Sequence, residues 1–477
     1  MELIKKFFQF ALGNIIILLI GLVTTPVITC LVTPEVLGKY SLFNTIGNLC
    51  VLLCMMGTDQ AFVRFYYEEN ENARGRLSKI LMKFCLGNVM LMCICFLLFK
   101  NLISRIIIGS ISPLTAIGLS LFVLFNVIYS IVLLELRIKQ RLNMYNILHT
   151  LQKLLYLFFI MTDFHIGIGD VAGLVAAVIL SYAGSALMGI LIEHKTWLIR
   201  PKIVIETSHH LKEMLFFGLP ILFSSIIAWV FQASDKFMLK FLSNYRELGI
   251  YSSTIEIIIL LNAVQAAFTT FWIPVAYEHY KNEPDNTCFY TKVNQIISFF
   301  MFNIAIFLIM GKSVLGILLG KEYWEAIYSF PFLMFMPIMY TISETTVLGI
   351  NFKKKTTYHI WISIISATSN IILNALFIPA FGARGAAIGT GLGYFVFWAG
   401  RTVFSLKCYK VDYNLGRFLM TTLLVYIYAA YSSFHISGYV TFIWGICLIL
   451  ILCFLYKEIL KWLIKEASGQ WKIQRRR

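Results

Sequence analysis

Residues 31–41 read LVTPEVLGKYS, and residues 242–252 read LSNYRELGIYS. Five positions are identical between the two stretches at an offset of 211 residues: Leu31, Leu37, Gly38, Tyr40 and Ser41 correspond to Leu242, Leu248, Gly249, Tyr251 and Ser252. An offset of this size indicates an internal duplication, and each copy then has to be a large structural unit. The repeat therefore predicts a chain built from two related halves.

The composition around this repeat is that of a membrane protein. Hydrophobic residues make up 59% of the 477 residues and charged residues only 13%, and the mean hydropathy is +0.78. A soluble domain carries about 25% charged residues, so too few charges are present to cover a soluble surface. The apolar residues form continuous runs, whereas the strands of an outer-membrane barrel alternate. The chain is therefore expected to be an all-α integral membrane protein, because only helices satisfy their own backbone in lipid.

Each apolar run is about the 20 residues that a spanning helix needs. We predict fourteen spans, at residues 7–32, 41–63, 80–99, 114–136, 147–162, 171–192, 214–234, 248–275, 294–311, 326–350, 358–380, 385–404, 418–434 and 438–456. The loops between them are short, so any transport or chemistry has to occur within the helices or at their ends.

Two further repeats support the duplication. Tyr145 and Tyr358 each follow a basic stretch, and Gly169 and Gly382 each open a run of small residues, both at an offset of 213. This offset covers six spans, and an even number returns the chain to the same side of the membrane. We therefore predict two parallel six-helix halves, 1–195 and 214–407, joined by a cytoplasmic linker at 196–213. Residues 408–477 form helices 13 and 14 and a basic cytoplasmic tail. Parallel repeats of this kind occur in rocking transporters.

The distribution of basic residues predicts the orientation. With the N-terminus in the cytoplasm, the inside segments carry 31 of the 40 Lys and Arg residues and the outside segments carry 9. This is a strong positive-inside bias, and it predicts that both termini are cytoplasmic. The net charge of +16 is then explained by loops that face anionic lipid, and no nucleic-acid partner is expected. The ten cysteines form no CxxC pair and accompany no histidine cluster, so we expect no metal and no cofactor.

Four motifs resemble a known family in their order and spacing. They are LxxPxxLGxYS with Pro34, Gly38 and Tyr40; MGTDQAFVRFYYEE with Gly57, Ala61 and Arg64; SDKFMLKFLSNYRELGIYS with Asp235 and Lys236; and FGARGAAIGT at 381–390. Together they resemble the polysaccharide-biosynthesis flippases of the Wzx type, whose superfamily includes the MATE multidrug exporters and the lipid II flippases.

The resemblance implies a MATE-like fold and a transport function without catalysis. Such proteins move an undecaprenyl-diphosphate-linked oligosaccharide across the bacterial cytoplasmic membrane, by alternating access of the two halves, for O-antigen, lipopolysaccharide or capsule synthesis. It also implies a coupling ion, proton or sodium, and a polymerase and glycosyltransferases of the same pathway as partners.

Ionisable residues within a membrane are costly and often line an aqueous cavity. We predict that Arg64, Lys236 and Arg401 contact the diphosphate or sugar as cations, and that Asp235, Glu256 and Glu344 hold those cations or carry the coupling ion. Several have a structural alternative. Arg64 and Arg401 lie near predicted cytoplasmic helix ends and can anchor the interface, Asp235 and Lys236 lie near the outer end of the predicted span 214–234, and Glu256 and Glu344 can satisfy one another or a nearby hydroxyl.

Other functions stay open at this point. A lipid II flippase or a multidrug exporter has the same architecture. A membrane-embedded glycan polymerase handles the same lipid-linked sugars, but such enzymes generally carry a large outside loop, and no predicted outside loop exceeds roughly 15 residues. The sequence GKS at 311–313 lacks the first glycine of a P-loop, which argues against an ATP-driven pump.

Overall fold

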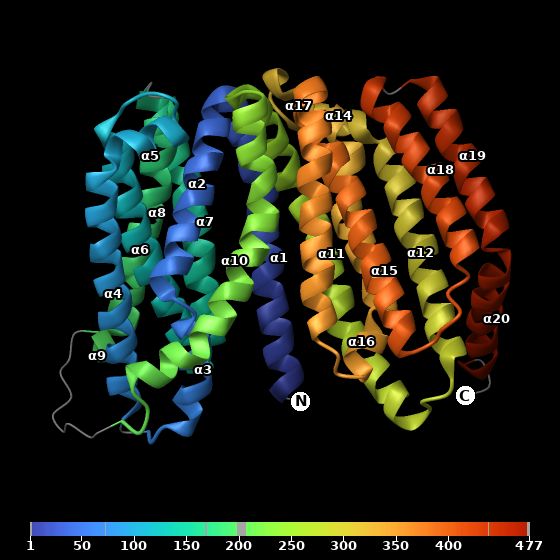
Figure 1. Cartoon of the computed structure of the whole chain (residues 1–477), viewed down its shortest axis with the longest axis horizontal. Coiled ribbons are helices and arrows are strands. Elements are labelled where there is room, and N and C mark those ends of the chain that lie inside the picture. Colours follow the sequence, from blue (N-terminus) through green and yellow to red (C-terminus); the bar gives the residue numbers. More distant parts are fainter. Residues whose placement is uncertain (1, 72, 167–168, 198–206, 437, 475–477) are drawn as a thin grey trace. The chain divides into compact units, whose positions relative to one another are not determined.

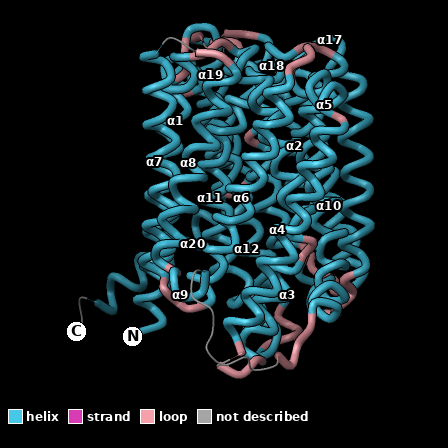
Figure 2. Tube along the Cα trace, turned by 90° about the vertical axis from the view of Figure 1, so that its left-hand side faces the viewer, coloured by secondary structure: helices cyan, strands magenta, loops and turns pink. Residues whose placement is uncertain are grey.

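The computed structural model describes residues 2–71, 73–166, 169–197, 207–436 and 438–474. Within these ranges the chain consists of helices and short loops, without strands (Figures 1 and 2). The all-α prediction is therefore confirmed. The predicted linker 196–213 includes residues 198–206, and the predicted tail includes 475–477; both lie outside the described residues.

The chain divides into two compact units, Met1–Phe237 and Met238–Arg477, with the boundary inside one helix, α10. The helices that begin in the first unit are α1 (Glu2–Leu31), α2 (Pro34–Met55), α3 (Thr58–Glu68), α4 (Arg74–Leu98), α5 (Lys100–Ile107), α6 (Pro113–Ile138), α7 (Leu142–Ile166), α8 (Val171–Ile192), α9 (His194–Trp197) and α10 (Leu211–Leu242). The second unit contains α11 (Tyr245–Asn282), α12 (Thr287–Met310), α13 (Lys312–Leu318), the 3₁₀ turn Lys321–Tyr323, α14 (Ala326–Leu333), α15 (Phe335–Thr346), α16 (Leu348–Phe352), α17 (Thr357–Cys408), α18 (Leu415–Phe434), α19 (Tyr439–Leu455) and α20 (Lys457–Gln474).

Every predicted span falls within a helix or a run of consecutive helices to within one residue at its ends. In the described part of the chain, nine helices are long and apolar enough to cross a membrane, or ten if the bent pair α19 and α20 is included. The difference from fourteen arises partly because the 52-residue helix α17 contains two predicted spans and is counted once. The count of fourteen therefore stays a prediction.

The repeated motif has the same local structure in both places. Thr33 and Asn244, which are 211 residues apart, each precede a helix, and each side chain accepts a hydrogen bond from the backbone N–H three residues later, that of Val36 and of Glu247. Such N-caps satisfy one of the free N–H groups at a helix start.

The basic stretches also form the same turn. Gln140 and Lys354 both adopt a left-handed backbone, with φ of 57° and 54°. In each turn the following residue donates its N–H to a carbonyl five residues earlier: Arg141 to Leu136, and Lys355 to Ile350. This is the six-to-one bond of a Schellman motif, which ends one helix and redirects the chain into the next. The duplication thus extends to backbone geometry.

Helix α17 folds back on itself at Gly382. This residue has φ of 54° and ψ of −126°, a conformation that requires glycine, and it separates the two predicted spans 358–380 and 385–404 without a loop. Beyond the turn, a row of glycines at four-residue spacing faces the first half of the helix: Gly385 lies against Phe377, Gly389 against Asn374 and Gly393 against Asn370. Small residues at this spacing let two membrane helices approach closely. The hairpin positions residue 401 inside the second unit.

Candidate functional site

A short polar run interrupts the apolar interior of the second unit. Ser343, Glu344, Thr345 and Thr346 follow one another in α15, and each is at most 4% exposed. They pack against the second half of α17, from which Arg401 projects toward the run. Buried polar groups have to find partners within the protein, so this segment defines a polar site inside an apolar unit.

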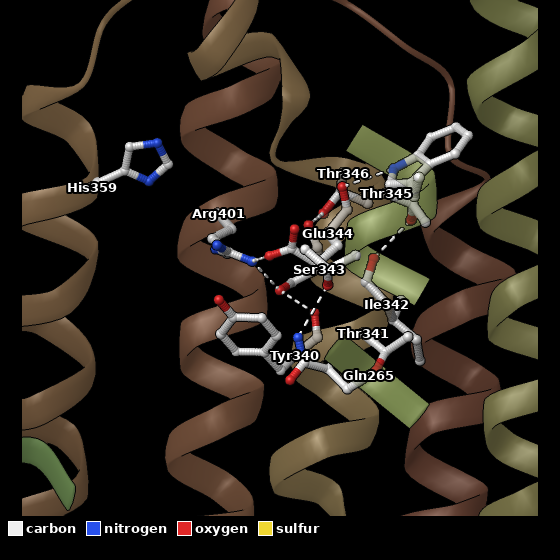
Figure 3. A network of polar contacts seen from close by, with 12 residues as sticks. Gln265, Tyr340, Thr341, Ile342, Ser343, Glu344, Thr345, Thr346, His359 and Arg401 are labelled. Carbon is white, nitrogen blue, oxygen red and sulfur yellow. Dashed lines mark hydrogen bonds and ion pairs between the residues drawn. The ribbon is translucent and has the colours of Figure 1, made fainter. Parts of the chain in front are cut away.

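Arg401 and Glu344 form an ion pair at this site (Figure 3). Arg401 Nη1 lies 2.6 Å from Glu344 Oε1 and donates a second hydrogen bond to Ser343 Oγ over 2.8 Å. The two side chains are only 10% and 5% exposed. Taking one partner away from such a pair leaves an uncompensated buried charge. The pair therefore places two opposite charges inside the unit, and the stability of the unit depends on both of them.

The guanidinium of Arg401 also lies over two aromatic rings. Its central carbon is 4.8 Å from the ring centroids of both Tyr340 and Phe397, which is within the range of cation–π contacts. Its Nε atom is buried and has no hydrogen-bond acceptor among the described residues. The Nε–H of Arg401 is thus available to donate to an additional acceptor, while the contacts of Nη1 hold the side chain in place.

The backbone and hydroxyl groups around the pair are held by three other helices. Trp272 of α11 donates its Nε1–H to the carbonyl of Glu344 over 3.2 Å, and Asn294 of α12 donates to Thr345 Oγ1 over 2.7 Å. Thr346 and Thr402 share a hydrogen bond of 2.9 Å between α15 and α17. These bonds connect the polar run to α11, α12 and α17, so the run is anchored to three helices besides its own.

Of the predicted residues of the first unit, Asp235 and Lys236 are neighbours on α10 and Arg64 lies on α3. Lys236 is half-buried on α10 and donates to Thr45 Oγ1 of α2 over 3.2 Å. Asp235 is 5% exposed on a different face of the same helix. Arg64, on α3, has a side chain that is 55% exposed, and it pairs with Glu68 at 3.4 Å and lies 4.9 Å from the ring centroid of Phe217.

Glu256 differs from the other predicted residues. It is exposed on α11, and no ion pair to it is found in the described part of the chain. Glu344 pairs with Arg401 and not with Glu256. Of the six predicted site residues, Arg401 and Glu344 are thus in direct contact within one unit.

The sequence reasoning missed Glu193, at the C-terminal end of α8. Its side chain is 5% exposed and forms ion pairs with both Lys139 and Arg141, which flank the left-handed turn between α6 and α7. Close by, Trp197 donates its Nε1–H to Glu135 over 3.2 Å. The partners are more than 50 residues apart in sequence, and the only available signal was an acidic residue directly after an apolar span.

Glu69 is a second acidic residue that the sequence reasoning missed. Its carboxylate accepts hydrogen bonds from the backbone N–H of Ser208 at 3.1 Å and of His209 at 3.3 Å, immediately before α10. Burial alone raises the pKa of Glu69, but these backbone hydrogen bonds outweigh it and hold the pKa below its ordinary value. The contact ties the end of α3 to the segment that leads into α10.

Lys312 is a buried cation that forms no ion pair with an acidic side chain among the residues that the structure describes. Its ammonium group donates to the carbonyls of Ser432 and His435 at the C-terminal end of α18, where the helix dipole favours a positive charge. Burial, assisted by the charge of Arg384, lowers the pKa of Lys312 to about 8. The lysine of the GKS sequence thus fastens α13 to α18. Among the described residues, no group of three or more His, Cys, Asp or Glu side chains is placed to hold a metal ion.

Comparison with known proteins places the chain in a family. Residues 3–280 match the model of the polysaccharide biosynthesis protein family. The chain belongs to this family. A relative of this chain is the capsular polysaccharide biosynthesis protein CapF of Staphylococcus aureus, with 25% identity over 198 residues. That match covers 39% of this chain and about half of the relative, 48% of its length.

Solved structures show the fold of this family member. The lipid II flippase MurJ in an inward closed conformation has a TM-score of 0.69 and 15% identity, and the match covers 95% of this chain and 100% of MurJ. A MATE multidrug transporter in an inward-facing conformation has a TM-score of 0.61 and 16% identity, covering 82% and 94% of the two chains. At these identities the similarity concerns the fold alone. This polysaccharide biosynthesis protein is therefore an all-α membrane protein with a transporter fold.

Proposed function

We propose that this chain is a flippase that moves an undecaprenyl-diphosphate-linked oligosaccharide across the bacterial cytoplasmic membrane for the synthesis of a cell-surface polysaccharide. The observation that carries the proposal is the family match over residues 3–280. The capsular polysaccharide relative and the fold shared with a lipid II flippase support it. Transport would occur by alternating access of the two halves and without a catalytic step.

The physical problem is the polar headgroup. Each hydroxyl that enters hydrocarbon without a partner costs about 2–7 kcal/mol, and a diphosphate costs far more. Cations inside a membrane protein lower this barrier, and arginine binds phosphate in a bidentate manner. We propose Arg64, Lys236 and Arg401 as the cations that contact the diphosphate or sugar. The unused Nε of Arg401 supports this assignment, although Glu344 has to release the guanidinium for full contact.

The acidic residues are proposed to respond to the coupling ion. Glu344 neutralises Arg401 in this state, so binding of a proton or sodium ion to its carboxylate would weaken the pair and expose the cation. Asp235, buried beside the lysine on α10, and Glu256, exposed on α11, are proposed to hold cations or a coupling ion at other stages. Glycosyltransferases and a polymerase of the same pathway are the proposed partners.

Complementation of a strain that lacks its own oligosaccharide flippase tests the function. We expect the wild-type gene to restore surface polysaccharide, and we expect Arg64→Ala and Lys236→Ala each to abolish it while the protein stays abundant in the membrane. Lys321→Ala, which removes an exposed lysine from the 3₁₀ turn, serves as the matched control. Normal export by the Arg64→Ala/Lys236→Ala double variant would contradict the site assignment, and failure of the wild type would contradict the function.

A lipid II flippase is the alternative that a specific observation favours, because the MurJ fold covers 95% of the chain. Rescue of a strain depleted of its lipid II flippase, without rescue of the oligosaccharide flippase strain, would establish this alternative. A multidrug exporter predicts instead a raised drug tolerance and no rescue of either strain.

The proposed orientation has both termini in the cytoplasm. Reporter fusions at Asn244 and Lys354 test it, because the positive-inside bias places these residues on opposite sides. Signals from the same side would show that the assignment of the spans between them is wrong. Transport by purified protein that requires ATP and ignores ion gradients would contradict the proposed coupling.

A further inference from the structure

The last described helix, α20, changes direction relative to the helix that precedes it. Helix α19 is an apolar segment of 17 residues, and the segment Lys457–Glu466 of α20 is bent from it by 72° after a single residue. If α19 crosses the membrane, a bend of this size turns α20 nearly into the plane of the membrane surface. The helix therefore begins at the depth of the lipid headgroups.

One side of α20 packs against α12 and α19 of the same unit, and these contacts fix how the helix is rotated. Ile459 is 5% exposed, and the helix contacts α12 and α19. The ammonium group of Lys292 on α12 lies 5.2 Å from the ring centroid of Trp462. Because these contacts fix the rotation of the helix about its axis, the residues on its outer side have a defined direction.

The outer side carries a row of three lysines beside an exposed apolar side chain. Lys457, Lys461 and Lys465 are all exposed, and their four-residue spacing puts them on one stripe of the helix. Ile464 lies three residues after Lys461, on the same side of the helix, and is 68% exposed. An amphipathic helix with lysines beside exposed apolar residues is typical of a helix that lies in a membrane interface.

The charge of this segment is complementary to an anionic surface. Residues 457–477 contain seven basic and two acidic residues, and the last three residues of the sequence are arginines. Juxtamembrane basic clusters are attracted to leaflets that contain anionic lipids, over distances of about a Debye length. In the orientation proposed above, α20 faces the cytoplasmic leaflet.

We propose that α20 lies on the membrane surface and binds the headgroups of anionic phospholipids through Lys457, Lys461 and Lys465, with Ile464 inserted at the boundary of the acyl chains. This inference does not depend on the transported substrate. An acidic protein partner is the competing occupant, and it would need the lysines but not the lipid.

Thermal unfolding of the purified full-length protein in a neutral detergent tests the proposal. We expect added phosphatidylglycerol to raise the unfolding midpoint and phosphatidylcholine to have little effect. In the Lys457→Gln/Lys461→Gln/Lys465→Gln variant, the phosphatidylglycerol concentration for the half-maximal shift should increase about tenfold or more. Ile464→Ser, which keeps the charge, should weaken the response to a smaller degree. Unchanged midpoints without lipid would show that the variants are folded.

The matched control removes three other exposed lysines from the same unit, in the variant Lys353→Gln/Lys354→Gln/Lys355→Gln. We expect this variant to respond to phosphatidylglycerol like the wild type. Equal loss of response in both triple variants would reduce the effect to net charge and overturn the proposal. An unchanged response to phosphatidylglycerol in the α20 variant would also overturn the proposal. If soluble polyglutamate raised the unfolding midpoint as much as phosphatidylglycerol does, an acidic protein partner would be favoured instead.

Discussion

Both units contain a carboxylate that pairs with basic residues, but the two sites differ in depth. Glu193 in the first unit lies at a helix end, and its partners Lys139 and Arg141 remain 25% and 44% exposed. Glu344 in the second unit lies within a helix, and its partner Arg401 is 10% exposed. The carboxylates are equally buried, at 5% each. The cations differ, since those of the first unit keep part of their hydration and Arg401 has lost nearly all of it.

This difference predicts different roles for the two sites. An ion pair whose cations stay hydrated costs little free energy to break. The pair of the first unit is therefore expected to stabilise the turn between α6 and α7. A dehydrated cation is stable only while its partner is ionised, so the pair in the second unit can respond to a single proton or ion.

The largest effect is expected at the buried pair. Glu344→Ala leaves the Arg401 guanidinium buried without its counterion and should destabilise the protein by about 3–5 kcal/mol. Chemical unfolding in detergent measures this loss. The double variant Glu344→Leu/Arg401→Met removes both charges and should be more stable than Glu344→Ala, yet fail in complementation. A double variant as unstable as the single variant would show that the charge pair is not the cause.

A smaller loss is expected at the first unit. Glu193→Ala removes the acceptor of two charged donors, and hydrogen bonds to charged groups contribute about 1.5–3 kcal/mol. Because Lys139 and Arg141 can be rehydrated by water, the measured loss should fall below that of Glu344→Ala in the same assay. A loss equal to or larger than that of Glu344→Ala would contradict the distinction between the two sites.

Glu69 predicts a pH-dependent contribution in the first unit. Its pKa is lower in the folded than in the unfolded protein, so its stabilisation is complete above the unfolded pKa, near 4.5, and is lost as the pH falls through the folded pKa. The stability difference between wild type and Glu69→Gln should therefore stay unchanged from pH 7 to about pH 5 and shrink as the pH is lowered from about 5 to about 3. A difference that stays constant over this range would contradict the role of the ionised carboxylate.

The smallest effect is expected at the two left-handed turn residues. Gln140→Gly and Lys354→Gly relieve a positive φ that costs a non-glycine residue about 1 kcal/mol, but glycine adds freedom to the unfolded chain. Each variant should be slightly more stable than the wild type, and the two gains should be similar. Lys355→Gly, whose residue has no positive φ, should give no gain. Unequal gains would show that the repeated turns are not energetically equivalent.

The fold class and the repeat could be predicted from the sequence, because both depend on local patterns of residues. Apolar length predicted the helices, and within the repeated motif the structure adds a matching detail, since Thr33 and Asn244 each cap the helix that follows. Arg401 and Glu344 were each selected for being ionisable at membrane depth, and Glu344 was predicted to hold a cation or carry the coupling ion. Its specific pairing with Arg401 was not predicted, since 57 residues and the α17 hairpin separate them. Glu193 and Glu69 were missed because their partners lie at distant positions in the chain. Whether the six selected residues serve transport stays a prediction.

The turn at Gly382 has a practical consequence for protein engineering. Between most pairs of helices a short peptide tag or a binding module can be inserted at an exposed loop tip. Here the backbone N–H of Ala383 donates to the Glu247 carboxylate over 2.8 Å, and a Cβ at position 382 would lie 2.5 Å from the same group. An inserted segment would have to displace this carboxylate and separate the glycine row from the facing half of α17. Labels for imaging or structure determination are therefore better placed at other loops of the chain.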